Sequence, residues 1–171
     1  MNHGCSTTIP RPNGKVRNGT LKVLLVWRKH AWADPGWKPW LFFFFDSRGI
    51  VHKEFVPPGQ TVNHAFYKDI LERLRKRVQR VRRDIADDWV LQHDNAPAHT
   101  ALSIREFLAK KNIPVLSHPS YSPDLALCDF YLFPKLKSKL KGISGRWENI
   151  QKIVTDELNT LTENDFQYCY D

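Results

Sequence analysis

The segment 61–83 limits the fold most strongly, because its apolar side chains recur every four or three positions. They are Val62, Phe66, Ile70, Leu74, Val78 and Val81. This spacing is that of one face of an α-helix. The other face is basic and carries Lys68, Arg73, Arg75, Lys76, Arg77, Arg80, Arg82 and Arg83. We therefore predict an amphipathic helix that buries one face against a core and turns cations to the outside.

Shorter β-type segments surround this helix. Residues 41–45 (LFFFF) and 50–56 (IVHKEFV) flank the turn sequence DSRG, and the prolines of PPGQ end the second run. This arrangement predicts a hairpin. Further strands are expected at 89–92 and 113–116, with a helix between them that starts at Thr100 as its N-cap. The order of strands and helices predicts an α/β domain in which helices flank a mixed sheet.

The N-terminal part of the chain differs from the rest. Residues 1–20 are rich in Gly, Pro, Asn and Thr, which predicts a flexible segment. The run LKVLLVW at 21–27 is compatible with a strand, and the sequence WADPGWKPW after it breaks regular structure. We divide the chain into a divergent or disordered segment over 1–40 and one domain over 41–171, whose last helices begin at about Leu125.

The charge of the chain indicates a polyanionic partner. Its 171 residues carry a formal net charge of +8, and the isoelectric point is near 9.5. Nucleic acid is the commonest partner of such a protein, although a solvated basic surface explains the same composition. Cys5, Cys128 and Cys169 are too far apart for a zinc knuckle or a disulfide framework, which fits a reducing compartment. No segment is long and apolar enough to span a bilayer, and we expect no membrane and no small-molecule substrate.

Two groups of basic residues are candidates for contacts with nucleic-acid phosphates. They are Arg73, Arg77 and Arg80 on the predicted helix, and Lys135, Lys137, Lys139 and Lys141 farther along the chain. A solvated helix face explains the first group equally well. The second group directly follows Asp129, where DNA would have to cross a metal site, and this favours a role in phosphate binding.

Two aspartates are candidate metal ligands. Asp94 comes just after the strand expected at 89–92, and Asp129 lies 35 residues later, after another strand. Catalytic residues of α/β sheets lie at strand ends, and carboxylate oxygens are the ligands that Mg²⁺ and Mn²⁺ prefer. Two such ions, held side by side, can carry out phosphoryl transfer without a nucleophilic side chain. The alternative is structural, because loop aspartates often cap helices or form turns.

Neighbouring polar residues favour structural roles. His93 and His99 flank Asp94, but their spacing with an intervening proline is not that of a zinc site. We interpret His93 as a strand-end residue and His99 as a hydrogen-bonding residue at the start of a helix. Asp124 follows Ser-Pro and is read as a turn or cap residue.

Two stretches closely resemble the catalytic core of mariner-family transposases, of the Tc1/mariner superfamily. They are HDNAPAHTALSIREFLAKKNIPVLSHPSYSPDLALCDFYLFPKLKSKLKG at 93–142 and FFDSRGIVHKEFVPPGQTVN upstream, within a resemblance that covers about 42–166. The resemblance implies a ribonuclease-H-like fold and cut-and-paste DNA transposition with Mg²⁺ or Mn²⁺. It also implies transposon-end and target DNA as partners and a nuclear location, and it leaves a homodimer open. The family carries three aspartates, and its last two match the spacing of Asp94 and Asp129.

The first aspartate of the family has no counterpart here. In the family it stands in a Gly-Asp-Glu sequence on the first strand, and residues 1–40 contain no such triplet, so we expect an incomplete first strand. Asp34 and Asp46 are the only aspartates before the long helix, and both lie in turns. The family's N-terminal helix-turn-helix module and C-terminal stretch are also not found, and Leu127 stands where the family usually has proline.

These departures lead us to expect that this chain does not cut or join DNA. Three interpretations remain open. The chain is an active strand-transferring nuclease, a DNA-binding remnant, or a decayed transposon copy without a role of its own. The missing carboxylate favours the second and third.

Overall fold

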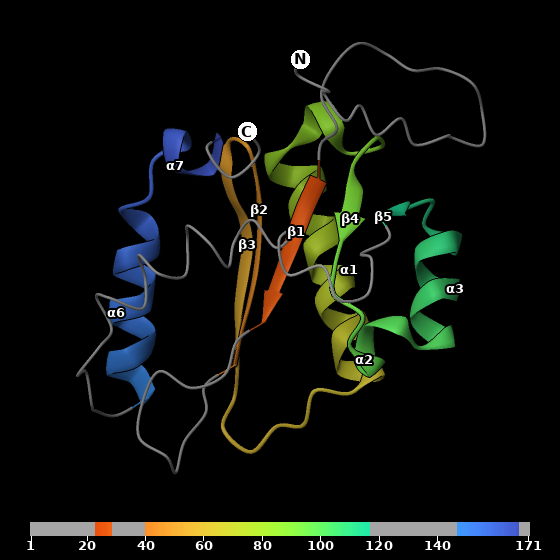
Figure 1. Cartoon of the computed structure of the whole chain (residues 1–171), viewed down its shortest axis with the longest axis horizontal. Coiled ribbons are helices and arrows are strands. Elements are labelled where there is room, and N and C mark those ends of the chain that lie inside the picture. The colour runs from red at the N-terminus through yellow and green to blue at the C-terminus, as the bar shows by residue number, and fades with distance from the viewer. Residues whose placement is uncertain (1–22, 29–39, 117–146, 168–171) are drawn as a thin grey trace, which may run out of the picture.

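The computed structural model describes residues 23–28, 40–116 and 147–167, and it contains a mixed five-stranded sheet (Figure 1). The strands are β1 (Val23–Arg28), β2 (Trp40–Asp46), β3 (Gly49–Val56), β4 (Val90–Gln92) and β5 (Val115–Leu116). Their order across the sheet is β3-β2-β1-β4-β5. β2 runs antiparallel to β1 and β3, whereas β4 runs parallel to β1 and β5. The predicted α/β class, with its 41–56 hairpin, is confirmed.

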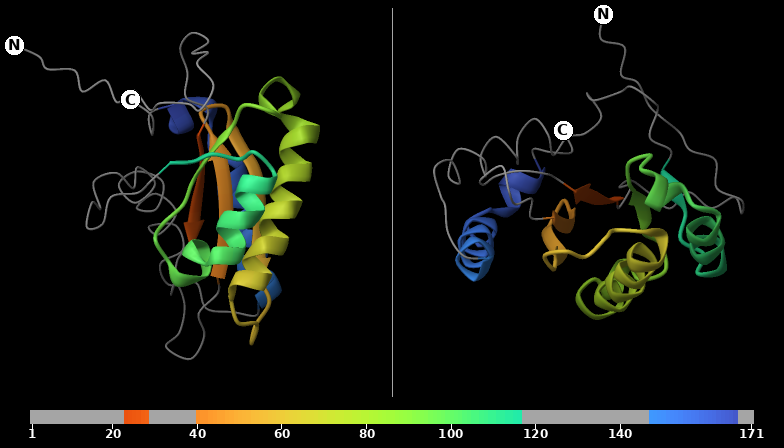
Figure 2. Two further views of the ribbon diagram at one scale, coloured as in Figure 1. Left: turned by 90° about the vertical axis from the view of Figure 1, so that its right-hand side faces the viewer. Right: turned by 90° about the horizontal axis from the view of Figure 1, so that it is seen from below.

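The helices pack around this sheet. They are α1 (His64–Val81), the short 3₁₀ turn η1 (Arg83–Ile85), α2 (Pro97–Thr100), α3 (Leu102–Lys110), α6 (Trp147–Asn159) and α7 (Glu163–Gln167). The views in Figure 2 show α1 packed on one face, while α6 stands beside the β3 edge. Among the described helices, none combines the length and apolar character that crossing a membrane requires.

Strand β1 belongs to the sheet although it precedes the range 41–171 that we predicted for the domain. The run at 21–27 forms a strand, and this strand lies in the middle of the sheet between β2 and β4. The local sequence could not reveal this position, because it depends on pairing with residues far along the chain. Residues 1–22 and 29–39 lie outside the described part.

The long helix forms over a shorter range than the apolar spacing suggested. Asn63 is its N-cap, and the Asn63 side chain accepts a hydrogen bond from the backbone N–H of Phe66 (2.9 Å). At the other end, Arg82 adopts a non-helical conformation, and η1 follows. The single helix expected from Thr100 is instead two helices, because Ala101 has an extended conformation. Thr100 is therefore the last residue of α2 and not an N-cap.

The run of four phenylalanines supplies core side chains to both faces of β2. Phe42 and Phe44 belong to the core under α1, together with Leu74 and other apolar residues of that helix. On the opposite face, Phe45 contacts Phe166 of α7 with 5.4 Å between ring centroids. All four phenylalanines are at most 1% exposed. Burial on both faces explains why this strand reads as a continuous apolar run and does not alternate.

Asp46 links the hairpin turn to the C-terminal end of α1 through hydrogen bonds. Its buried carboxylate accepts hydrogen bonds from Nε and Nη2 of Arg82 (2.8 and 3.2 Å) and from the backbone N–H of Arg48 (3.0 Å). Gly49, the next turn residue, has a φ of 122°, which side-chain-bearing residues rarely adopt. The turn sequence DSRG therefore encodes both the hairpin and its attachment to the helix.

We expect Asp46→Asn to lower the free energy of unfolding by about 3 kcal/mol, because the mostly buried Arg82 guanidinium would lose its counter-charge. Urea denaturation of both proteins measures the difference. The control is Glu72→Gln, which removes the half-exposed i,i+3 pair with Arg75 and should cost less than about 1 kcal/mol. Equal losses in the two variants would contradict the role given to Asp46.

Candidate functional site

Asp94 lies in the loop that follows β4, at the C-terminal end of that strand. Its Oδ1 accepts a hydrogen bond from the backbone N–H of Ala96 (3.1 Å) and lies 2.5 Å from Nδ1 of His99. The Asp94 side chain is 58% exposed, whereas that of His99 is 1% exposed. A carboxylate at the surface is thus held in orientation by a buried imidazole. His99 is the hydrogen-bonding residue at a helix start that the sequence predicted.

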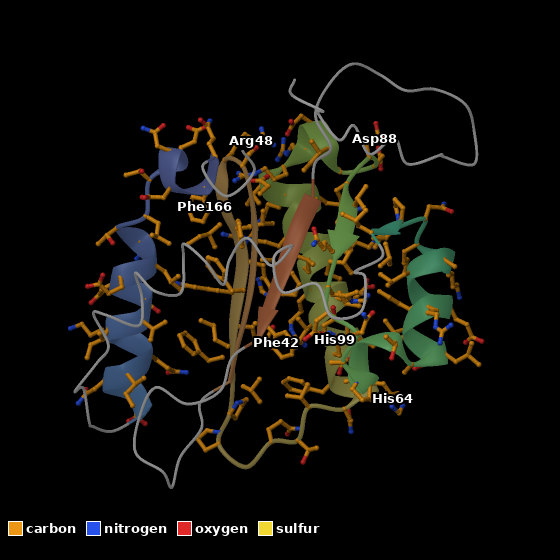
Figure 3. All side chains as sticks on the ribbon, in the orientation of Figure 1. Phe42, Arg48, His64, Asp88, His99 and Phe166 are labelled. Atoms are coloured by element: carbon orange, nitrogen blue, oxygen red, sulfur yellow. The ribbon has the colours of Figure 1, made fainter. Side chains whose placement is uncertain are left out.

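A layer of aromatic and imidazole rings packs around the ring of His99. The ring of Tyr67 lies 3.9 Å from that of His99, and the rings of His93 and His99 are parallel at 5.4 Å. Phe42 closes the layer at 6.3 Å, and Figure 3 shows Phe42 and His99 at the same end of the sheet. The layer joins β2, α1, α2 and the end of β4, so the position of Asp94 depends on the packing of the whole domain.

The hydrogen bonds of this layer define its protonation pattern. Burial, together with the charge of the neighbouring His99, lowers the pKa of His93 to about 4, against an opposing effect of Asp94. His93 is then neutral at pH 7, and its Nδ1 is hydrogen-bonded to the Tyr67 hydroxyl (2.9 Å). Burial, and then the charge of Asp94, raise the pKa of that phenol.

The two ring nitrogens of His99 have different surroundings. Its Nδ1 donates a hydrogen bond to the Asp94 carboxylate. Nε2 is buried and has no hydrogen-bond partner in the described part of the chain.

The strand beside β4 brings no carboxylate to this end of the sheet. In the parallel pairing of β1 with β4, Leu25 is level with Gln92. This is the last pair of the register, so Trp27 continues β1 while Asp94 lies in the loop after β4. β1 as a whole reads VLLVWR. Within the described residues, no group of three His, Cys, Asp or Glu side chains is arranged to hold a metal ion.

Asp46 is not a substitute for the missing ligand. It pairs with Gly49 at the start of the hairpin, level with the N-terminal part of β1, whereas Asp94 lies past the C-terminal end of β4. Figure 3 shows this separation, with Arg48 of the hairpin at one end of the sheet and His99 at the other. Asp34, Asp124 and Asp129 lie outside the described residues, so the predicted approach of Asp94 and Asp129 stays a prediction.

The structure describes only one of the two predicted groups of phosphate-binding residues. Lys135, Lys137, Lys139 and Lys141 lie outside the described residues. Arg73, Arg77 and Arg80 lie on one side of α1, facing β3. Arg73 forms a two-pronged ion pair with Glu54, with N–O distances of 2.9 and 2.6 Å. Arg77 donates from Nε to the backbone carbonyl of Val51 (3.3 Å), so both arginines also have structural roles.

Comparison with known proteins gives a consistent picture. A family model described as DDE superfamily endonuclease matches residues 40–161. The Mariner Mos1 transposase of Drosophila mauritiana is 35% identical over 158 residues, which are 82% of this chain and 46% of that protein. The human histone-lysine N-methyltransferase SETMAR is 30% identical over 101 residues, 58% of this chain and 15% of that protein. The chain thus spans less than half the length of these relatives.

Solved structures agree with the sequence comparison. The crystal structure of the catalytic domain of Mos1 mariner transposase matches with a TM-score of 0.80 at 29% identity, covering 87% of this chain and 75% of that one. The Mos1 mariner paired end complex with Mn matches with a TM-score of 0.76 at 28% identity, covering 87% of this chain and 51% of that one.

The buried state of His93 predicts a specific dependence of stability on pH. Its pKa is about 4 when folded and near 6.5 when unfolded, so the unfolded chain binds more protons between these values. The stabilisation is complete above pH 6.5 and is lost as the pH falls toward 4. From this residue we expect the free energy of unfolding to drop by about 2 kcal/mol between pH 7.5 and pH 5.

The measurement is urea denaturation at both pH values. His93→Asn keeps an acceptor for the Tyr67 hydroxyl and should remove most of the drop, whereas the control His64→Gln changes an exposed residue and should keep it. A drop of the same size in the His93→Asn protein would show that other groups cause it.

Proposed function

Because the chain belongs to the DDE superfamily of endonucleases, we propose that its domain is the catalytic domain of a mariner-type transposase, a fold for divalent-metal-dependent cleavage and joining of DNA. Asp94 supports this assignment, since it is an exposed and oriented carboxylate at the C-terminal end of a central strand. We propose further that the present chain binds DNA but does not cut it.

We propose Asp94 and Asp129 as ligands for Mg²⁺ or Mn²⁺. Hard carboxylate oxygens suit both ions, and Mos1 structures have been solved with each. Such an ion supplies charge stabilisation and activates a water or a 3′-hydroxyl for attack on a phosphate. The contribution of the chain is orientation. The N–H groups of His99 and Ala96 hold Oδ1 of Asp94, which limits rotation of the carboxylate.

The composition of β1 is the observation that carries the proposed loss of cleavage. Two divalent ions at 3.5–4 Å repel each other strongly, so a two-ion site needs several negative ligands. β1 is the neighbour of β4 in the sheet, and its six residues include no Asp or Glu. The described residues therefore fit one ion at Asp94 and fall short of a two-ion site. The DNA-binding remnant is our preferred function on this ground.

Partners and location follow from the same family. We propose duplex DNA as the ligand, with Lys135, Lys137, Lys139 and Lys141 near the Asp129 end and the arginines of α1 as contacts. We propose a nuclear location, where such DNA is found. Mos1 has been solved as a paired end complex, and by analogy a second copy of this chain is a further candidate partner.

We expect the purified chain to leave supercoiled plasmid intact in Mg²⁺ or Mn²⁺, as judged by nicking on an agarose gel. Trp27→Asp adds a carboxylate near the C-terminal end of β1, two residues after the Leu25 that pairs with Gln92, and should tighten Mn²⁺ binding, measured by calorimetry, by about tenfold or more. It should also allow nicking. Trp27→Asn is the uncharged control and should do neither, and Asp94→Asn added to Trp27→Asp should abolish both gains.

Two outcomes contradict the proposal. Nicking by the unchanged chain that disappears in Asp94→Asn shows that its site is complete. A folded Trp27→Asp protein with unchanged Mn²⁺ affinity shows that β1 is not where the ligand is missing.

A further inference from the structure

We propose that a basic groove beside the open edge of the sheet is a second binding site for the phosphodiester backbone of duplex DNA, separate from the Asp94 end. The groove lies between α1, β3 and the end of α6, and its volume is about 770 Å³. Five of its nine lining residues are Lys or Arg, and none is Asp or Glu. The cations are Lys53, Arg73, Lys76, Arg77 and Arg80. The inference rests on the proposed function only in that DNA is the ligand.

The cations of the groove differ in how far they are already engaged. Arg73 is paired with Glu54, and Arg77 donates to the backbone of Val51. Within the described residues, Lys76 and Arg80 form no ion pair. They are one helical turn apart, about 6 Å along the axis, which is within the span of two successive phosphates of one strand. These two side chains are therefore the ones open to a ligand.

Lys53 lies on the opposite wall of the groove, on β3. Burial lowers the pKa of its ammonium group, an effect that the negative charge of Asp156 partly opposes. A partly desolvated cation lacks some of its hydration, so an anion in the groove would restore part of what burial removes. The wall facing α1 is thus also suited to a phosphate.

The groove is too far from Asp94 to hold the same phosphate. Tyr67, whose ring lies under His99, is 13 residues before Arg80 on α1, which corresponds to about 20 Å along the helix axis. The groove also borders β3, at the opposite side of β1 from β4. The groove would therefore bind a part of the DNA duplex that is distant from the part at the metal ligands. Contact at both places would fix the orientation of the duplex on the domain.

The lining favours a nucleic-acid backbone over an acidic protein. Protein interfaces are centred on apolar or aromatic side chains that become buried. Here the apolar lining residues are Ile50 and Val51, and Val51 is already 2% exposed. Long cationic side chains form most of the lining, and Lys and Arg are the side chains that commonly contact phosphate oxygens without reading sequence.

The test compares two double variants of the whole chain with the same loss of charge. Lys76→Gln/Arg80→Gln removes the two open groove cations, and Lys110→Gln/Lys152→Gln removes two exposed lysines of α3 and α6 outside the groove. Binding of a fluorescent 30-base-pair duplex of arbitrary sequence is followed by anisotropy over a series of salt concentrations. EDTA is present, so that metal at Asp94 does not contribute. Circular dichroism verifies that both variants are folded.

We expect the groove variant to flatten the slope of log K against log salt by about 1.8, and to weaken binding roughly 60-fold at 0.1 M salt. The control should change the slope by less than about 0.5. Equal changes in the two variants overturn the groove but leave the proposed DNA ligand standing. No binding by the unchanged chain overturns both. Displacement of the duplex by polyglutamate more readily than by unlabelled duplex overturns the groove site in favour of an acidic protein.

Discussion

A buried phenol connects the elements around Asp94. Tyr67 is fully buried near the start of α1, and its hydroxyl needs a hydrogen-bond partner there. His93 supplies it, because β4 ends at the level of this hydroxyl. The face of the same ring supports His99, which in turn orients Asp94. A polar group that must be satisfied inside the core thereby determines where an exposed carboxylate stands.

The two ends of the sheet carry different kinds of carboxylate, one structural and one exposed, and β1 runs between these ends. At one end the buried pair of Asp46 and Arg82 ties the hairpin to α1. At the other end Asp94 is exposed. A cluster of carboxylates at that end would destabilise the fold by mutual repulsion, a cost that functional sites commonly carry. Strand β1 contains no Asp or Glu and avoids this repulsion, so the sheet does not depend on a complete set of carboxylates.

Local patterns were sufficient for the elements whose cause is local. The apolar spacing predicted α1, the DSRG turn predicted the hairpin, and the end of an apolar strand located Asp94. Three features depend on contacts between distant residues and escaped prediction. They are the central place of β1, the interruption at Ala101 between α2 and α3, and the groove, whose walls come from β3, α1 and α6. The basic face of the predicted helix included both Lys76 and Arg80, but only Arg80 was predicted to contact phosphate, and the opposite wall on β3 was not predicted.

The β3 edge, which has no second strand partner in the described sheet, has a consequence for how the protein behaves in concentrated solution. In the described sheet, β3 pairs only with β2, and an unpaired edge is a template on which a strand of another molecule can add. Arg77 occupies the Val51 carbonyl on β3, and the surrounding cations repel the same edge of a second molecule. The positive charge along α1 therefore also protects against fibre-like self-association. A polyanion that neutralised it without covering β3 would remove that protection.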